Sequence, residues 1–253
     1  MRQQQPRDRV VIVTGAGRGI GTSVALRFAQ DGARVAVIDL FLERAEAVAQ
    51  KITASNGTAI AEACDVRDAA AVERAVANIT KRYGRIDVLI NCAGAYCEPK
   101  LAHETSEETW DLVVDSNLKG TFLFCKAVLP HMLAQKSGRI INFASNAARS
   151  VATGLGPEYT AAKTGVLGLT RHIAKQYAGS GILVNAIAPG PTNVPRLREG
   201  RTQEYLDYHA GMIPVGRLAD PEEHAEVVFF MASDGASFMT GATIDNNGGI
   251  IMV

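Results

Sequence analysis

The feature that most constrains the fold is a regular alternation of short apolar runs with longer amphipathic segments. The runs are rich in β-branched residues and nearly continuous in apolar side chains, which is typical of strands buried on both faces of a parallel sheet. This order predicts an α/β chain with a doubly wound, seven-stranded, mostly parallel sheet and helices on both faces. The expected strands are 9–14, 34–39, 58–64, 86–91, 139–145, 182–188 and 242–245, and the expected helices are 19–30, 42–55, 68–83, 106–134, 158–178 and 221–232.

The alternation continues along the chain without a linker, an internal repeat or a low-complexity tract. We therefore expect residues 1–253 to form a single Rossmann-type domain. The longest irregular stretch is about 189–215, which contains four prolines and a short helix expected at 201–211. An irregular excursion of that length in a compact domain is usually functional.

The composition argues against several classes of protein. Lys and Arg number 26 and Asp and Glu number 26, so no basic excess favours nucleic acid or an anionic membrane surface as a partner. No run reaches the roughly 18 apolar residues of a membrane helix, and the polar N-terminus lacks the apolar core of a secretory signal. The cysteines and histidines show no metal-ligand spacing. We expect a cytoplasmic protein with reduced thiols and no metal site.

The first predicted strand runs directly into TGAGRGIG, residues 14–21. Its glycines are spaced G-x-x-x-G-x-G, at Gly15, Gly19 and Gly21, because Ile20 stands where G-x-G-x-x-G requires the last glycine. A tight turn before a helix lets backbone N–H groups approach a pyrophosphate, so we expect a dinucleotide site. The alternative is a tight strand–helix connection that needs glycine only for its positive φ.

Asp39 ends the second predicted strand. In a doubly wound sheet, a carboxylate at this place accepts hydrogen bonds from the ribose hydroxyls of NAD and repels the 2′-phosphate of NADP. Arg18, in the glycine turn, would instead pair with that phosphate. We give Asp39 the greater weight and expect NAD as the cofactor, with NADP less favoured. An Asp that only caps the next helix is the structural alternative.

Further polar and small residues follow the third and fourth predicted strands. Open parallel sheets bind ligands beyond the carboxyl ends of their strands. We expect Asp65 to accept a hydrogen bond from the adenine amino group, with Val66 beside the ring. Asn91, Ala93 and Gly94 belong to a turn of small residues against which a cofactor can lie.

Six motifs occur in order across nearly the whole chain: TGAGRGIG, NCAG, SNL, INFAS, YTAAK and NAIAPG. In this combination the sequence resembles the short-chain dehydrogenase/reductase family. The resemblance implies an NAD(P)-dependent oxidoreductase that interconverts a secondary alcohol and its ketone by hydride transfer.

The resemblance also implies the catalytic residues. Tyr159 would exchange a proton with the substrate oxygen, and Lys163 would lower the pKa of Tyr159 and hold the nicotinamide ribose. Ser145 would hydrogen-bond the substrate oxygen, and Asn117 would bind a water that connects Lys163 to solvent. The residue types suit the chemistry, because a phenol with an ordinary pKa of about 10 is a poor base and a nearby ammonium favours phenolate.

Pro189 and Gly190 follow the sixth predicted strand and are expected to contact the nicotinamide. The family often has Thr where Val194 stands, so Thr192 would supply either its hydroxyl or its amide to the carboxamide. Two other departures are Cys92, where the family often has Asn, and an interval from Ser145 to Tyr159 that is one residue longer than usual. The longer interval indicates an insertion in the loop that lines the substrate pocket.

Residues 192–213 match the family's variable substrate lid. Its apolar side chains either close over an apolar substrate or face the core around a small helix. The chain ends in GGIIMV, and we expect this apolar tail to pack at a subunit interface of a homotetramer or homodimer.

The leading prediction is therefore an NAD(H)-dependent alcohol dehydrogenase or ketoreductase with a small-molecule substrate. The rival enzyme is a 3-oxoacyl-[acyl-carrier-protein] reductase that uses NADPH. Such reductases tend to have Arg where Ser180 stands, and Lys136 compensates only in part. A remote alternative is a non-catalytic dinucleotide-binding regulatory protein, which the complete set of catalytic residues argues against.

Overall fold

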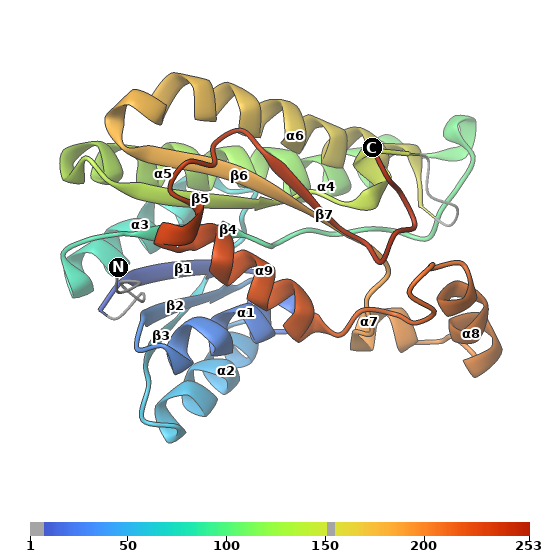
Figure 1. Ribbon diagram of the computed structural model, residues 1–253, viewed down its shortest axis with the longest axis horizontal. Helices are drawn as coiled ribbons and strands as arrows, with labels where there is room; N and C mark the ends of the chain where they lie inside the picture. Colours follow the sequence, from blue (N-terminus) through green and yellow to red (C-terminus); the bar gives the residue numbers. More distant parts are fainter. Residues whose placement is uncertain (1–7, 151–154) are drawn as a thin grey trace.

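The computed structural model describes residues 8–150 and 155–253. Its centre is one sheet with the strand order β3–β2–β1–β4–β5–β6–β7, and every pairing in it is parallel (Figure 1). This arrangement confirms the predicted doubly wound sheet. The strands are β1 (Val10–Thr14), β2 (Arg34–Asp39), β3 (Thr58–Ala63), β4 (Val88–Asn91), β5 (Gly138–Phe143), β6 (Ile182–Pro189) and β7 (Thr243–Asn246).

Helices cover both faces of the sheet, as Figure 1 shows. Successive side chains of a strand point to opposite faces, so Val10 and Ile12 pack with α3, α5 and α6, whereas Val11 and Val13 pack with α1, α2 and α9. Burial on both faces explains why the strands read as unbroken apolar runs. The helices are α1 (Gly19–Gln30), α2 (Leu42–Ala54), α3 (Ala69–Tyr83), α4 (Glu107–Val114), α5 (Gly120–Gln135), α6 (Pro157–Tyr177), α7 (Pro195–Arg198), α8 (Gln203–Gly211) and α9 (Pro221–Ala232).

The expectation of one unbroken helix over 106–134 is wrong. A π-helical segment, Asp115–Lys119, separates α4 from α5. Two side chains in it bind carbonyls of the preceding turn: Ser116 Oγ donates to the Leu112 carbonyl at 2.7 Å, and Asn117 Nδ2 donates to the Val113 carbonyl at 2.8 Å. Such bonds compete with the regular helical pattern, and π segments are frequent at functional sites.

The sheet has one topological switch point, between β1 and β4. The chain builds β2 and β3 on one side of β1 and β4 to β7 on the other. The connections that leave β1 and β4 therefore diverge at the carboxyl ends of these strands, which is the place where doubly wound sheets bind ligands. In the part of the chain that the structure describes, no helix is long and apolar enough to cross a membrane.

Candidate functional site

The glycine turn lies at the switch point, between β1 and α1. Gly15 and Gly19 have φ angles of +64° and +60°, a region that glycine adopts without the strain of other residues. A Cβ on Gly15 would lie 2.7 Å from Cα of Ala93, and one on Gly21 would overlap the carbonyl of Gly15. The first turn of α1 itself contains no acidic residue that would oppose an anion at the positive end of the helix dipole. These features fit a bound pyrophosphate.

Asp39 lies directly beside this turn. It is 8% exposed, and its carboxylate accepts hydrogen bonds from the N–H groups of Gly17 at 3.0 Å and Phe41 at 3.2 Å. A Cβ on Gly17 would lie 2.6 Å from the Asp39 carboxylate oxygen, so only glycine allows this approach. The side chain of Arg18, the N-cap residue of α1, is exposed. Ile20 is half-buried and packs against the core.

Asp65 is held by its neighbour Arg67 through a two-pronged ion pair. Arg67 Nη2 lies 2.6 Å from Asp65 Oδ2, and Arg67 Nε lies 2.9 Å from Asp65 Oδ1. These hydrogen bonds hold the pKa of Asp65 below its usual value. The Arg67 backbone N–H also donates to Asp65 Oδ1 at 3.0 Å, so most of the roughly four lone-pair sites of this carboxylate are already used by Arg67. Val66 packs against α5 at Gly120, where a Cβ would lie 2.6 Å from Val66 Cγ2.

Thr14, at the end of β1, holds the turn after β4. Its hydroxyl accepts hydrogen bonds from the N–H groups of Cys92 and Ala93, both at 3.1 Å. Thr14 is not among the residues predicted from the sequence, although a polar residue that ends an apolar strand is a visible signal. Burial raises the pKa of the Cys92 thiol to about 12, so this side chain stays protonated and neutral.

Asn91 was predicted to contact the cofactor, but its side chain turns into the protein. Nδ2 donates to Asn142 Oδ1 at 2.9 Å, and the residue is 3% exposed. Any contact of Asn91 with a cofactor is therefore left to its backbone.

Tyr159 and Lys163 lie one turn apart near the start of α6. Lys163 Nζ is 5.7 Å from the centre of the Tyr159 ring and donates to the Phe143 carbonyl, at the end of β5, at 2.7 Å. Lys163 is 5% exposed, so little water screens its charge from the phenol. The structure thus brings these two predicted residues together. The Tyr96 ring meets the Tyr159 ring edge-on, with centres 6.5 Å apart.

Ser145 follows β5 and caps a short turn of helix. Its hydroxyl accepts a hydrogen bond from the N–H of Ala147 at 3.1 Å and donates to Asn146 Oδ1 at 3.1 Å. It is 7% exposed. The predicted substrate loop, 146–158, continues from here and lies partly outside the described residues.

Asn117 is carried by the π segment. Its Nδ2 donates to the Ala95 carbonyl at 2.7 Å, which fixes the orientation of the amide. Its Oδ1 is buried, and none of the described residues donates a hydrogen bond to it. A buried carbonyl without a partner costs about 1–3 kcal/mol, and an ordered water is the usual remedy. The π segment also packs closely on α6, where a Cβ on Gly165 would lie 2.7 Å from Leu118 Cδ2.

The turn after β6 packs against β7 and α9. Gly190 N–H donates to the Asn246 carbonyl at 3.1 Å, and a Cβ on Gly190 would lie 2.8 Å from Cα of Asn247. The Thr192 hydroxyl donates to the Gly190 carbonyl at 2.9 Å and lies 2.8 Å from His224 Nε2. Val194 reaches the glycine turn, 3.4 Å from the position of a Cβ on Gly19.

His224 also belongs to this region, and its sequence context indicates only the first turn of a helix after Pro221. It is fully buried, and burial lowers its pKa to about 4. No local signal marks it, because its contacts are with residues far away in the chain.

The lid region forms α7 and α8, which stand apart from the sheet (Figure 1). The short helix expected at 201–211 corresponds to α8, whereas α7 was not expected. Leu206 is buried, and Tyr208 is 67% exposed. Arg201, between α7 and α8, pairs with Glu98 after β4, with Nη2 and Oε1 3.0 Å apart, so an exposed ion pair tethers the lid to the segment that follows β4.

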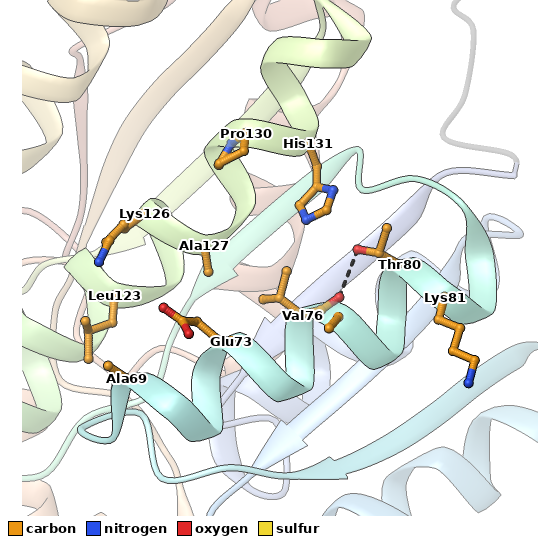
Figure 2. Close-up of a pocket in the computed structure, with 11 residues that line it drawn as sticks. Ala69, Glu73, Val76, Thr80, Lys81, Leu123, Lys126, Ala127, Pro130 and His131 are labelled. Atoms are coloured by element: carbon orange, nitrogen blue, oxygen red, sulfur yellow. Dashed lines mark hydrogen bonds between the residues drawn. The ribbon is translucent and has the colours of Figure 1, made fainter.

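A separate surface hollow of about 550 Å³ lies between α3 and α5 (Figure 2). Apolar residues such as Val76 and Leu123 line it, together with Glu73 and Lys126. None of the described residues predicted to act in catalysis or cofactor binding lines it. The predicted site residues lie at the carboxyl ends of the strands and not in this hollow.

Comparisons with known proteins show which proteins the chain resembles over nearly its whole length. A family model described as "Enoyl-(Acyl carrier protein) reductase" matches residues 15–251. The D-threitol dehydrogenase of Mycolicibacterium smegmatis is 40% identical over 242 residues, which cover 95% of this chain and 92% of that protein. A 3-oxoacyl-[acyl-carrier-protein] reductase of Thermotoga maritima is 36% identical over 244 residues, covering 96% and 98%. The solved structure of gox2181 matches with a TM-score of 0.94 at 34% identity and covers 97% of this chain and 96% of that chain.

Proposed function

The chain belongs to the short-chain dehydrogenase/reductase family and is an oxidoreductase of alcohol- or ketone-type substrates, and from this premise we propose that it is an NAD(H)-linked secondary-alcohol dehydrogenase. The observation that carries the choice of cofactor is the buried Asp39 carboxylate beside the glycine turn. At this place it accepts from both ribose hydroxyls and repels a 2′-phosphate. Arg18 is exposed and has freedom to turn away, so it does not offset this repulsion.

The proposed binding mode uses one residue set for each part of the dinucleotide. The pyrophosphate lies on the N-terminus of α1, over Gly15, Gly19, Ile20 and Gly21. Asp39 holds the adenosine ribose, and Asp65 and Val66 hold the adenine. Ala93, Gly94 and the Asn91 backbone support the middle of the cofactor. The nicotinamide half is held by Tyr159, Lys163, Pro189, Gly190 and Thr192.

The proposed chemistry follows from four side chains. When bound, the nicotinamide takes up or supplies the hydride. In the oxidative direction, the Tyr159 phenolate removes the hydroxyl proton of the substrate. The Ser145 hydroxyl rotates away from Asn146 Oδ1 and donates its hydrogen bond to the substrate oxygen instead. The buried Lys163 ammonium stabilises the phenolate through its charge. Asn117 Oδ1 holds a water that passes the proton onward from Lys163 to solvent.

The test of this proposal separates binding from catalysis. We expect Tyr159→Phe to keep NADH affinity within about twofold and to lower kcat by a factor of 10² or more, the range of general acid–base catalysis. Phe has the shape of Tyr without its hydroxyl, so packing is preserved. If turnover of the best substrate survives this change, the acid–base role of Tyr159 is refuted.

The second candidate is a reductase of 3-oxoacyl thioesters that uses NADPH. The similarity to the Thermotoga maritima reductase favours it. The similarity to a D-threitol dehydrogenase favours a small polyol instead. A panel of polyols, cyclic diols, hydroxy steroids and 3-hydroxyacyl thioesters, assayed with NAD and with NADP, distinguishes them. A preference for a thioester with NADP would select the reductase.

We also propose that copies of the chain associate through the β7 edge and α9. β7 ends the sheet, so one of its edges has no strand partner among the described residues. Nearby Phe230 is 46% exposed, Phe238 is fully exposed, and Met252 is 81% exposed. Light scattering distinguishes a homotetramer or homodimer from a monomer, and Phe238→Ser is expected to weaken the assembly. We place the enzyme in the cytoplasm, where its four cysteines remain reduced.

A further inference from the structure

A chain of polar side chains runs from β7 through α9 to the turn after β6. Asn246 Nδ2 lies 2.9 Å from His224 Nδ1, and His224 Nε2 lies 2.8 Å from the Thr192 hydroxyl. The Thr192 hydroxyl in turn donates to the Gly190 carbonyl at 2.9 Å. His224 has no exposed surface, and Thr192 is 7% exposed. Three elements that are distant in sequence therefore meet behind the proposed nicotinamide site.

The hydrogen bonds of this chain select one form of the imidazole. The Asn246 amide nitrogen also donates to the Glu223 carbonyl at 3.4 Å, so this atom is the amide N rather than the amide O. Because an amide nitrogen only donates, His224 Nδ1 must accept and carry no proton. The remaining proton lies on Nε2, which donates to the Thr192 oxygen. His224 is thus neutral and of a single tautomer, in agreement with its burial.

With His224 in this form, the hydrogen-bonding groups of the Thr192 hydroxyl are already used inside the protein. The hydroxyl proton is donated to the Gly190 carbonyl, and one oxygen lone pair accepts from His224 Nε2, so the hydroxyl stabilises the turn. On the other side, Ala219 N–H donates to the Pro191 carbonyl at 3.1 Å and Asn193 N–H donates to the Ala219 carbonyl at 2.8 Å. In a parallel bridge of this kind the residue between the two bonds, Thr192, turns its own N–H away from the bridge partner.

We propose that His224 is a positioning residue for the nicotinamide half of the cofactor, acting through Thr192. It holds the Thr192 hydroxyl in place so that the Thr192 backbone N–H, and not the hydroxyl, is presented to the carboxamide. This inference rests on the proposed function of the 189–192 turn. It also decides between the two contacts of Thr192 that the sequence left open.

A purely structural role would not require these polar groups. Burying an imidazole costs free energy unless both ring nitrogens find partners, and an apolar side chain would fill the same space without that cost. A fully satisfied polar chain instead fixes one geometry, because each donor faces one acceptor. The geometry it fixes here is that of the turn beside the glycine loop, which Val194 contacts at Gly19.

The experiment compares two ligands in four proteins. NADH and ADP-ribose, which lacks the nicotinamide, are titrated into the wild type, His224→Leu, Asn246→Val and Val228→Ala. Val228 is buried one turn farther along α9 and takes no part in the polar chain, so its variant reports on helix packing alone. Thermal unfolding shows that each variant is folded.

We expect His224→Leu to weaken NADH binding about tenfold and Asn246→Val about threefold, while ADP-ribose binding changes less than twofold. Val228→Ala should lower thermal stability without separating the two ligands. The double variant Thr192→Val, His224→Leu should recover most of the NADH affinity, because an apolar pair restores packing and the backbone N–H remains.

Three results would overturn the inference alone, and a fourth would overturn the proposed function together with it. Equal weakening of NADH and ADP-ribose would show a structural role only, and unchanged NADH affinity in a folded His224→Leu would show no role. Failure of the double variant to recover would indicate that the Thr192 hydroxyl itself binds the carboxamide. If the wild type binds neither NADH nor NADPH, the proposed function fails, and this inference fails with it.

Discussion

Replacing Asp39 by alanine should change the cofactor preference of this enzyme. The wild-type carboxylate is 8% exposed, so salt and water screen it little. Its removal deletes the proposed hydrogen bonds to the ribose hydroxyls, and a hydrogen bond to a charged group contributes about 1.5–3 kcal/mol net of the exchange with water. We expect a net loss of about 2 kcal/mol, or roughly 30-fold in NADH affinity.

The same change should favour NADPH. Two unit charges 4 Å apart repel by about 4 kcal/mol in an effective dielectric of 20, and a mobile phosphate relieves part of this by moving away. A remaining gain of about 2 kcal/mol gives a roughly 30-fold rise in NADPH affinity, so the preference shifts about 10³-fold in total. Loss of the partners of the Gly17 and Phe41 N–H groups adds a cost that both cofactors share.

Fluorescence titration of NADH and NADPH measures both affinities directly. Asp65→Ala is the matched control, because this carboxylate also lies at a strand end but is expected to meet the adenine common to both cofactors. It should change the two affinities by the same factor. The reasoning is refuted if the wild type prefers NADPH, or if Asp39→Ala weakens both cofactors equally.

Three further predictions test the site and its supports. Burial lowers the pKa of His224 from 6.5 to about 4, so between these pH values the unfolded chain binds a proton that the folded chain does not bind. The free energy of unfolding, measured in urea, should therefore fall by up to about 3 kcal/mol as the pH is lowered from 6.5 to 4. His224→Leu should remove this contribution to the pH dependence of stability. Gly94→Ala should lower kcat at least tenfold in steady-state assays, because its Cβ would overlap Asn117 Oδ1 and displace the proposed water. Gly84→Ala is the control: a Cβ there meets nothing within 4 Å but φ is +76°, so the change should cost about 1 kcal/mol of stability and leave kcat unchanged. Glu98→Gln removes the exposed ion pair to Arg201 and should raise the KM of the substrate by no more than about fivefold. Salt screens exposed charges, so this difference from the wild type should vanish in high salt. A large increase in KM that persists at about 1 M salt would contradict a simple tether.

The sequence by itself determined the architecture and the residues of the proposed site. A parallel sheet covered on both faces leaves continuous apolar runs, and these runs mark each strand to within a few residues. Glycine at Gly15 is required by a positive φ and a close backbone approach, and Tyr159 and Lys163 share a helix face because they are four residues apart. These signals are local, so they can be found without knowledge of which segments meet.

Only the tertiary structure decided how the side chains at the strand ends are used. Asn91 turns inward because Asn142, on the neighbouring strand, offers its amide oxygen, and the helix expected over 106–134 opens at Asn117 because side chains compete for its carbonyls. The proposed role of His224 depends on its contacts with Thr192 and Asn246, which lie 32 and 22 residues away along the chain. Hydrogen bonds between distant residues leave no periodic pattern in a sequence, because their geometry exists only after the sheet and its two helical layers have packed.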